Sequence, residues 1–259
     1  MAWISLLTDF GLRDPYVGIM KGVIFSIAPQ ARLMDLTHGI PPQDVAAARF
    51  ALMTAHPYLP PGTIQLAVVD PGVGGARRGI ALQLPTGYLV GPDNGLFSGI
   101  LSQSAVLAAV ELNNPTYWRS RNPSRTFHGR DIFAPAAAHL ANGIPLRELG
   151  DPLNPAELIK LDWPEPEQLT NGWRGVIQAI DHFGNGISTL PGQVLEGRSW
   201  RVILQGIRIP SGHTFAEAAA GELIALVGSS GWVEIAMNRG NASRALGLKV
   251  GDEIRVEWV

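Results

Sequence analysis

The stretch from Ala67 to Arg78 constrains the fold of this chain more than any other part of the sequence. It is apolar as far as Val69, becomes polar at Asp70, passes through three glycines and ends on Arg77 and Arg78. Such a run is typical of a buried strand that ends in a flexible loop. Ligands of α/β proteins bind at the carboxyl ends of strands, which makes Asp70 a candidate site residue. Buried strands also end in Asp-Pro-Gly turns without any chemical role, so this stretch alone leaves both interpretations open.

The first two-thirds of the sequence alternates between strand-like and helix-like patterns, which predicts a layered α/β fold. The strand-like runs cover residues 3–7, 32–36, 63–69, 79–84, 88–90 and 106–110. The helix-like runs cover residues 15–27, 44–55 and 131–141. We expect Asp14 to cap the first of these helices, with Pro15 at the first helical position.

A proline-rich segment separates this part of the chain from a region with a different pattern. Between Asp151 and Gln168 the proline density suits a linker, with Pro152, Pro155, Pro164 and Pro166. Short strands with glycine turns follow, over residues 173–180, 186–189, 200–204, 222–227, 233–236 and 253–258. The sequence therefore predicts an N-terminal α/β domain over residues 1–165 and a smaller, barrel-like all-β domain over residues 170–259.

The composition favours a cytoplasmic enzyme and excludes several kinds of partner and site. Of the 259 residues, 46% are hydrophobic and 16% are charged, enough to bury one large core or two smaller ones. A net charge of −2 gives no electrostatic basis for binding nucleic acid or an anionic membrane. The absence of cysteine excludes disulfides, zinc–thiolate sites and a thiol nucleophile. No apolar run approaches the roughly 20 residues of a membrane-spanning helix.

Three more polar segments lie at the ends of expected elements. Asp9 follows the first strand, and residues 181–185 follow a strand of the second domain. His128 lies between an aromatic residue and a glycine just before a helix, where an imidazole is well placed to contact a substrate. Other histidines have simpler interpretations, and His38, which precedes a glycine, is expected to be an ordinary turn residue.

Together, the four polar segments resemble the family of S-adenosylmethionine-cleaving enzymes that includes the hydroxide adenosyltransferases, the fluorinase and the chlorinase. The resemblance extends from Thr8 to Gly251. It implies displacement at the 5′ carbon of S-adenosylmethionine (SAM) by water or hydroxide, which gives adenosine and methionine. SAM is then the substrate, and neither a cofactor nor a metal is implied, because a sulfonium is already a good leaving group.

The resemblance also implies a catalytic group of three residues around the attacking water, namely Asp70, Arg77 and His128. Arg77 would favour the anionic oxygen, while Asp70 and His128 would orient the water and accept or relay its proton. The sequence does not identify which of them takes the proton.

Differences from the fluorinase favour the water-using branch of the family. Where the fluorinase has Tyr, Thr and Ser around the halide, this chain has Asp70, Val73 and Gly129, and Gln43 replaces a Trp over the substrate. The loss of two hydroxyls and the gain of a carboxylate disfavour a bare halide, because hydrogen bonds are lost and charge repulsion is added.

The resemblance assigns substrate contacts to both predicted domains. Asp9 matches the residue that grips the ribose hydroxyls, and Asp14 and Tyr16 lie near positions at the methionine end. In the second domain the matching residues, on the methionine amine, the adenine side and the carboxylate side, are Asp181, Phe183, Asn185, Asn238 and Asn241. The family further implies a homotrimer, with each site between the α/β domain of one subunit and the β domain of its neighbour.

Other functions remain open at this point. The chain could be a SAM-binding or nucleoside-binding sensor without turnover, or an enzyme closer to the halogenases. Acids and a histidine at strand ends also suit a hydrolase that uses magnesium or manganese, with Asp9, Asp70, His128 and Asp131 as candidate ligands. Against this hypothesis, no two of these residues have compact ligand spacing, and Arg77 would lie beside the cation.

Overall fold

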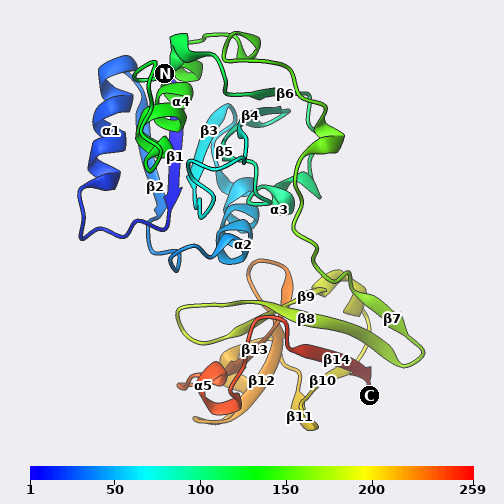
Figure 1. Cartoon of the computed structure of the whole chain (residues 1–259). Coiled ribbons are helices and arrows are strands. Elements are labelled where there is room, and N and C mark those ends of the chain that lie inside the picture. Colours follow the sequence, from blue (N-terminus) through cyan, green and yellow to red (C-terminus); the bar gives the residue numbers. More distant parts are fainter. The chain divides into compact units, whose positions relative to one another are not determined.

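Two separate sheets organise the chain, one within Met1–Leu161 and one within Asp162–Val259, and each has its own core (Figure 1). These observations come from a computed structural model that describes all 259 residues. The first unit combines strands with helices, whereas the second is almost entirely made of strands. The predicted fold class, a layered α/β domain followed by a smaller barrel-like β domain, is confirmed.

The sheet of the first unit has six strands in the order β2-β1-β3-β5-β4-β6. Four adjacent strands run parallel to one another: β1 (Trp3–Thr8), β2 (Arg32–Thr37), β3 (Thr63–Val68) and β5 (Gly87–Pro92). The sheet continues at one edge with β4 (Gly79–Leu84), which is antiparallel to β5, and then β6 (Ala108–Glu111), which is antiparallel to β4. Because β2, β1 and β3 are parallel neighbours, the segments that follow them emerge at one edge of the sheet.

Helices cover both faces of this sheet. On one face, α1 (Tyr16–Ile27) and α4 (Ala134–Ala141) pack over Ile4, Leu6 and Leu66. On the other face, α2 (Val45–Ala55) and the short α3 (Ser98–Leu101) pack over residues of opposite parity, such as Leu7 and Ala67. The strands are therefore buried on both sides, which explains why they are apolar runs rather than alternating ones.

The start of α1 differs from the prediction. Pro15 itself occupies the N-cap position, no side chain caps the helix, and the first helical residue is Tyr16. Asp14 is one residue too early to reach the free N–H groups of the first turn, so it is not the cap. The prediction was correct for α2, where the Asp44 carboxylate accepts a hydrogen bond from the Ala47 N–H at 2.8 Å.

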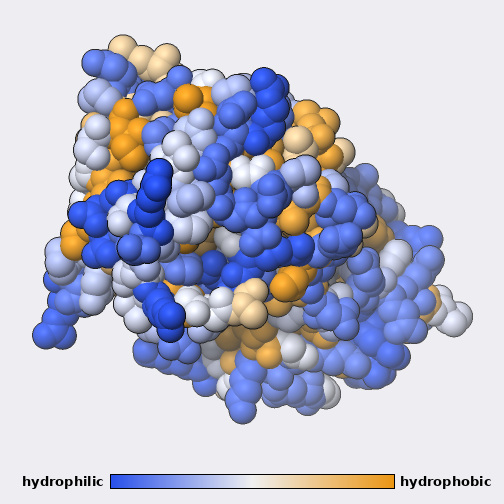
Figure 2. Space-filling view, turned by 45° about the horizontal axis from the view of Figure 1, so that its top comes forward, coloured by the Kyte–Doolittle hydropathy of each residue, from blue (hydrophilic) through white to orange (hydrophobic).

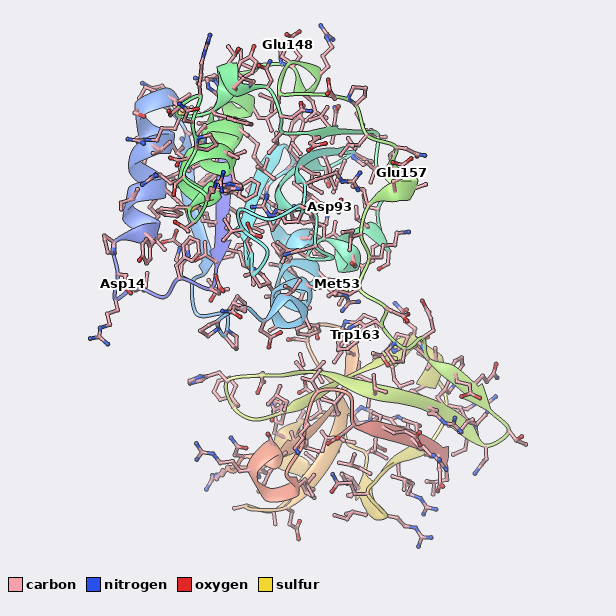
Figure 3. The ribbon with its side chains drawn as sticks, viewed as in Figure 1. Asp14, Met53, Asp93, Glu148, Glu157 and Trp163 are labelled. Atoms are coloured by element: carbon pink, nitrogen blue, oxygen red, sulfur yellow. The ribbon has the colours of Figure 1, made fainter.

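Part of the predicted linker belongs to the first unit. The Ile159 N–H donates to Asp93 Oδ1 at 2.9 Å, and the Leu161 N–H donates to Ser98 Oγ at 2.8 Å. Leu158 is buried in the core beside them. Asp93 lies beside the segment that carries Glu157 (Figure 3). Residues 158–161 are therefore anchored despite the surrounding prolines, because an apolar side chain and matched backbone donors hold them to the sheet.

The second unit is a nearly closed antiparallel sheet. Its path runs β11-β10-β14-β8-β9-β13-β12, and β7 pairs with β8 off this path. A bridge between Ser211 and Ala225 joins the regions of the two end strands. The strands are β7 (Glu167–Leu169), β8 (Gly172–Ile180), β9 (Gly186–Pro191), β10 (Trp200–Leu204), β11 (Ile207–Pro210), β12 (Leu223–Val227), β13 (Trp232–Met237) and β14 (Glu253–Trp258). Sequence patterns missed the two short strands β7 and β11 and the five-residue helix α5 (Ala242–Leu246).

One face of the molecule is largely polar. Figure 2 shows hydrophilic side chains over most of one face of the molecule, with hydrophobic ones distributed among them. None of the helices has both the length and the apolar character needed to cross a membrane.

Candidate active site

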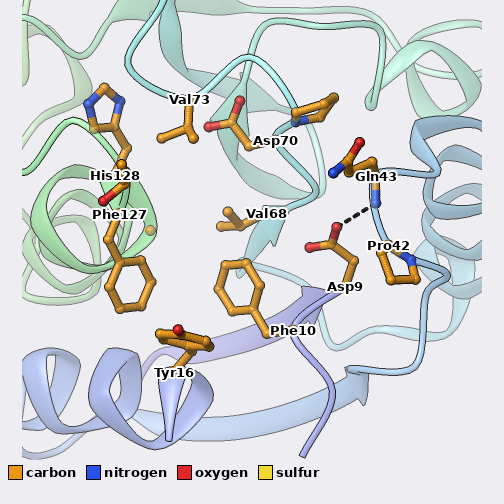
Figure 4. Close-up of a pocket in the computed structure, with 13 residues that line it drawn as sticks. Asp9, Phe10, Tyr16, Pro42, Gln43, Val68, Asp70, Val73, Phe127 and His128 are labelled. Carbon is orange, nitrogen blue, oxygen red and sulfur yellow. Dashed lines mark hydrogen bonds between the residues drawn. The ribbon is translucent and has the colours of Figure 1, made fainter. Parts of the chain in front are cut away.

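A cavity of about 390 Å³ opens at the carboxyl ends of β1 and β3 in the first unit. Four segments that are distant in sequence line it (Figure 4): Asp9, Phe10 and Tyr16; Pro42 and Gln43; Val68, Asp70, Pro71 and Val73; and Thr126, Phe127, His128 and Gly129. The parallel order of the strands accounts for this convergence, because the segments after β2, β1 and β3 leave the sheet side by side. Of the residues predicted for the site, Asp9, Tyr16, Asp70 and His128 therefore lie around one cavity.

Arg77 is not part of the cavity lining but is hydrogen-bonded to two residues that are, Asp70 and His128. Its Nε donates to Asp70 Oδ1 at 2.8 Å, and its terminal nitrogen donates both to Asp70 Oδ2 and to His128 Nδ1, the latter at 2.8 Å. The Asp70 and Arg77 side chains are 5% and 10% exposed. A guanidinium binds a carboxylate with two parallel hydrogen bonds, which fixes orientation as well as charge. The three residues predicted as the catalytic group therefore form one bonded cluster, which we call the Asp70–Arg77–His128 cluster.

The glycines between Asp70 and Arg77 allow the loop to fold back. Gly74 has a φ of +74°, and a Cβ there would lie 2.1 Å from the carbonyl oxygen of Arg125. Any other residue would clash with the backbone in addition to being strained. The Arg77 guanidinium lies over the ring of the buried Phe133, 5.1 Å from its centroid. Loop and ring together hold the guanidinium between the carboxylate and the imidazole.

The surroundings of His128 favour its neutral form. Burial lowers the pKa of the imidazole, and the positive charge of Arg77 lowers it further, while Asp70 and Asp131 act in the opposite direction. A guanidinium can only donate hydrogen bonds, so His128 Nδ1 must accept the bond from Arg77. The neutral ring therefore carries its hydrogen on Nε2, and that N–H is available as a donor.

A wide turn of π-helix, Gly129–Phe133, follows His128 and precedes α4. Such turns often occur at functional sites. Inside it, the buried Asp131 accepts two hydrogen bonds of 2.7 Å from Arg130 and one of 2.8 Å from the Ser124 N–H. Asp131 thus holds the segment that precedes His128 in the sequence, and it is not part of the cavity lining.

The candidate metal ligands are not arranged as a metal site. Both Asp70 and Asp131 are hydrogen-bonded to arginines. No group of three or more His, Asp or Glu side chains is placed to hold a metal ion. The arrangement of Asp9, Asp70, His128 and Asp131 therefore gives no support to the hypothesis of a metal-dependent hydrolase.

Asp9 lines the same cavity as Asp70 and His128. Its Oδ2 accepts a hydrogen bond of 2.7 Å from the Gln43 N–H, drawn in Figure 4. Gln43 has a φ of 67°, an unusual conformation for a residue other than glycine, which turns its N–H toward the carboxylate. This backbone N–H is the only hydrogen-bond donor to the Asp9 carboxylate, which therefore keeps acceptor capacity for a ligand.

Three aromatic rings close the end of the cavity below Val68 (Figure 4). The centroids of Phe10, Tyr16 and Phe127 lie 5.3 to 5.9 Å apart, and each pair meets edge to face. The sequence predicts Tyr16 as a contact but not Phe10 or Phe127, although each of the two is adjacent to a predicted site residue. Asp14 is exposed and is not part of the lining.

The predicted residues of the second unit form a separate group of two adjacent segments. The Asp181 carboxylate accepts hydrogen bonds from the N–H groups of Phe183 and Asn185 and from the Asn185 side chain, at 2.8 to 2.9 Å. Asn241 caps α5 and lies directly against Gly184. The Asn238 amide donates to the Ala218 carbonyl at 2.7 Å. Phe183 is 71% exposed, so its ring is free for another contact.

Comparison with known proteins places both units in one family. Residues 4–150 match the SAM hydroxide adenosyltransferase N-terminal domain, and residues 175–255 match the C-terminal domain of the same family. The chain is 45% identical to the (R)-S-adenosyl-L-methionine hydrolase of Salinispora tropica, with 98% of this chain and 97% of that protein covered. Identity to the fluorinase of Actinoplanes sp. is lower, 28%, with 98% and 96% covered.

A solved structure shares the whole architecture. The crystal structure of an uncharacterized conserved protein from Thermotoga maritima superposes with a TM-score of 0.91 at 37% identity. The match covers 98% of this chain and 99% of that one, so both units are included.

Proposed function

The chain belongs to the SAM hydroxide adenosyltransferase family and hydrolyses SAM to adenosine and L-methionine, and we propose that the Asp70–Arg77–His128 cluster is its catalytic group. One observation carries this assignment. The segments after β1 and β3 line one cavity, and there the guanidinium of Arg77 is hydrogen-bonded to both the Asp70 carboxylate and the neutral imidazole of His128. This group is suited to act on a water molecule.

The reaction needs little help at the leaving group. The water oxygen forms a bond to the 5′ carbon, the bond from that carbon to sulfur breaks, and the electron pair stays on sulfur as methionine forms. Water is a weak nucleophile while it keeps both protons, so alignment and removal of a proton limit the reaction. The protein's contribution is therefore expected at the water and not at the sulfonium.

The hydrogen-bond directions assign different roles within the cluster. His128 already has hydrogen on Nε2 and an occupied Nδ1, so it donates to the water and orients it. Each Asp70 oxygen accepts a bond from Arg77 and has a lone pair left, so Asp70 is the group that receives the proton of the water. Arg77 fixes the position of both partners and stabilises negative charge as the oxygen attacks.

The other end of the cavity suits the remainder of the substrate. Both ribose hydroxyls can donate to the free acceptor sites of the Asp9 carboxylate. The electron-rich faces of Phe10, Tyr16 and Phe127 are a suitable surface for the cationic sulfonium and its methyl group. We assign Tyr16, and more remotely Asp14, to the methionine end.

A halide would be a poorer nucleophile here than water. Asp70 and the apolar Val73 line the cavity where an anion would need hydrogen-bond donors. At Gly129 a Cβ would already lie 3.2 Å from Met20 Sδ, so the chain has little room for a hydroxyl-bearing residue. These features support hydrolysis over halogenation.

The second unit is proposed to complete the site from a neighbouring copy of the chain. The catalytic group lies wholly before residue 162, whereas Asp181, Phe183, Asn185, Asn238 and Asn241 lie wholly after it. This separation, together with the family resemblance, supports a homotrimer with sites between subunits. Mixing inactive Asp70→Asn chains with inactive Asn185→Ala chains should then restore part of the activity on reassembly. A monomer by light scattering, or mixed oligomers without recovery, would overturn the trimer.

The function is tested by following the oxygen atom. Purified protein incubated with SAM, a chelator and ¹⁸O-labelled water should release methionine and adenosine that carries the label on its 5′ oxygen. A bound but unreacted substrate would support a sensor in place of an enzyme. Activity that a chelator abolishes and a divalent metal restores would contradict the proposed mechanism.

A further inference from the structure

A chain of polar side chains runs from the surface to the residue that precedes Asp9. Lys21 Nζ lies 2.7 Å from Asp35 Oδ2, and His38 Nε2 lies 3.1 Å from Asp35 Oδ1. His38 Nδ1 lies 2.8 Å from Thr8 Oγ1. Thr8, the last residue of β1, is completely buried, and His38, just after β2, is 5% exposed. The histidine therefore lies in the bend after β2, beside a glycine, and connects the ends of two parallel strands.

The direction of each hydrogen bond follows from Asp35. Burial alone would raise the pKa of its carboxyl group, but Lys21 and His38 bring the pKa below its ordinary value. Asp35 is thus ionised, and its Oδ1 lies 3.1 Å from His38 Nε2 without the angle of a hydrogen bond. The negative charge beside Nε2 favours the tautomer with hydrogen on that nitrogen, and Nδ1 then accepts from the Thr8 hydroxyl. The Thr8 oxygen in turn accepts from the Phe10 N–H, 3.2 Å away.

These contacts fix the backbone on both sides of Asp9. Thr8 and Phe10, its two neighbours in sequence, are joined by the Thr8 hydroxyl. The Gly11 N–H donates to the His38 carbonyl oxygen at 2.8 Å. The Asp9 carboxylate itself makes only the bond from Gln43. Its aim into the cavity therefore depends on the turn from Thr8 to Gly11, and that turn is held by His38 at two points.

We propose that His38 is a positioning residue that acts through Thr8 to aim the Asp9 carboxylate at the substrate. The proposal rests on the proposed role of Asp9 in holding the ribose. A threonine hydroxyl rotates freely about its Cβ–Oγ bond unless a partner defines its direction. The imidazole Nδ1 defines it, and the lone pairs of Oγ1 are thereby directed at the Phe10 N–H. The aspartate and lysine behind the ring select the tautomer that makes this possible.

Two matched pairs of variants test the proposal with SAM as substrate. Thr8→Val removes the hydroxyl and keeps the shape, whereas Thr8→Ser keeps the hydroxyl. His38→Leu removes both ring contacts, whereas His38→Asn retains an acceptor near the Nδ1 position. We expect Thr8→Val and His38→Leu each to raise KM about tenfold with kcat within about threefold, as the loss of one buried hydrogen bond would. Thr8→Ser should stay within about twofold of the unchanged protein in KM, and His38→Asn should recover part of the loss.

The double variant Thr8→Val/His38→Leu shows whether His38 acts on KM through Thr8 or independently of it. If His38 acts through Thr8, the double variant has about the same KM as either single variant, because the second change breaks nothing further. Multiplied effects on KM would overturn the proposal, as would a lower melting temperature with KM unchanged. Should His38→Leu not fold, the Thr8 pair alone decides the result.

Asp9→Asn in the same assay separates this proposal from the proposed function. If Asp9→Asn leaves KM unchanged, Asp9 does not hold the substrate, and both the proposed role of Asp9 and the positioning role of His38 are overturned. If Asp9→Asn raises KM while Thr8→Val and His38→Leu do not, the role of Asp9 stands and only the positioning role of His38 is overturned.

Discussion

Two aspartates in this molecule follow a strand and precede an aromatic residue and a glycine, yet their carboxylates are used differently. Asp181, after β8, accepts three hydrogen bonds from its own turn. In the turn after β1, the Thr8 hydroxyl and the His38 carbonyl accept the hydrogen bonds from the backbone N–H groups, and the Asp9 carboxylate accepts only one bond, from Gln43. The first carboxylate is engaged mainly by its own turn, whereas the second keeps most of its acceptor capacity for a ligand. A strand-end acid is thus available for binding when another group performs the local capping.

Asp70 is a third strand-end acid, and its replacement gives the largest expected effect. Asp70→Asn removes the proton acceptor and one charge of the pair with Arg77 but keeps the shape. We expect kcat to fall about a thousandfold with a small change in KM, because the carboxylate acts on the water and not on the nucleoside. Steady-state kinetics measures this. A kcat within tenfold of the unchanged protein would remove Asp70 from the catalytic group.

His128 is expected to give the next largest effect and a defined pH dependence. His128→Ala should lower kcat about a hundredfold, because the donor that orients the water is lost. Burial and Arg77 lower the pKa of this imidazole, so it is neutral at and above neutral pH and becomes charged only in acid. Activity should therefore fall as the pH drops, with a midpoint below the ordinary histidine value of about 6.5. A pH profile with its midpoint above that value would contradict the neutral assignment.

Asp9→Asn is expected to act on substrate binding. The amide offers one acceptor where the carboxylate offers two, so we expect KM for SAM to rise about ten- to thirtyfold with kcat less affected. The stability of the protein should hardly change, because Asp9 caps nothing in its own turn. A fall in kcat larger than the rise in KM would show that Asp9 belongs to the reaction side.

Asp181→Ala should give the smallest effect on stability among these predictions that is large enough to measure, and Asp9→Asn should not show it; any effect of Asp181→Ala on substrate binding comes in addition. Loss of three hydrogen bonds within one turn is expected to destabilise the protein by about 1 to 2 kcal/mol, measured by urea unfolding. Phe183→Ala is the matched control, since its exposed ring makes no contribution to a core and its removal should leave stability unchanged. An Asp181→Ala protein of unchanged stability would contradict the inference that the Asp181 carboxylate stabilises its own turn.

The sequence predicts the architecture well because its signals are local. Apolar runs mark the buried strands, and Asp44 marks the start of α2. The prediction was wrong for the cap of α1 because Pro15 shifts the helix start past Asp14. Residues 158–161 fall within the predicted N-terminal domain but also within the stretch that local prolines mark as a linker, and partners as distant as Asp93 and Ser98 hold them to the first unit.

The site is less visible in the sequence, because its hydrogen bonds join distant residues. The resemblance predicts Asp70, Arg77 and His128 as one catalytic group, but not that Arg77 holds both partners at once and so fixes the tautomer of His128. The partnership between Gln43 and Asp9 depends on one backbone N–H turned by a positive φ, which leaves no sequence signal. The contacts of His38 with Thr8 and Asp35 depend likewise on the pairing of β1 with β2.

The central claim is that one carboxylate acts on the water and another on the nucleoside. Calorimetric titration of the product adenosine into the unchanged protein, Asp70→Asn and Asp9→Asn measures this division without any turnover. We predict that the Kd for adenosine changes less than about threefold in Asp70→Asn and weakens about tenfold or more in Asp9→Asn. Equal weakening in both variants, or the larger loss in Asp70→Asn, would contradict the account.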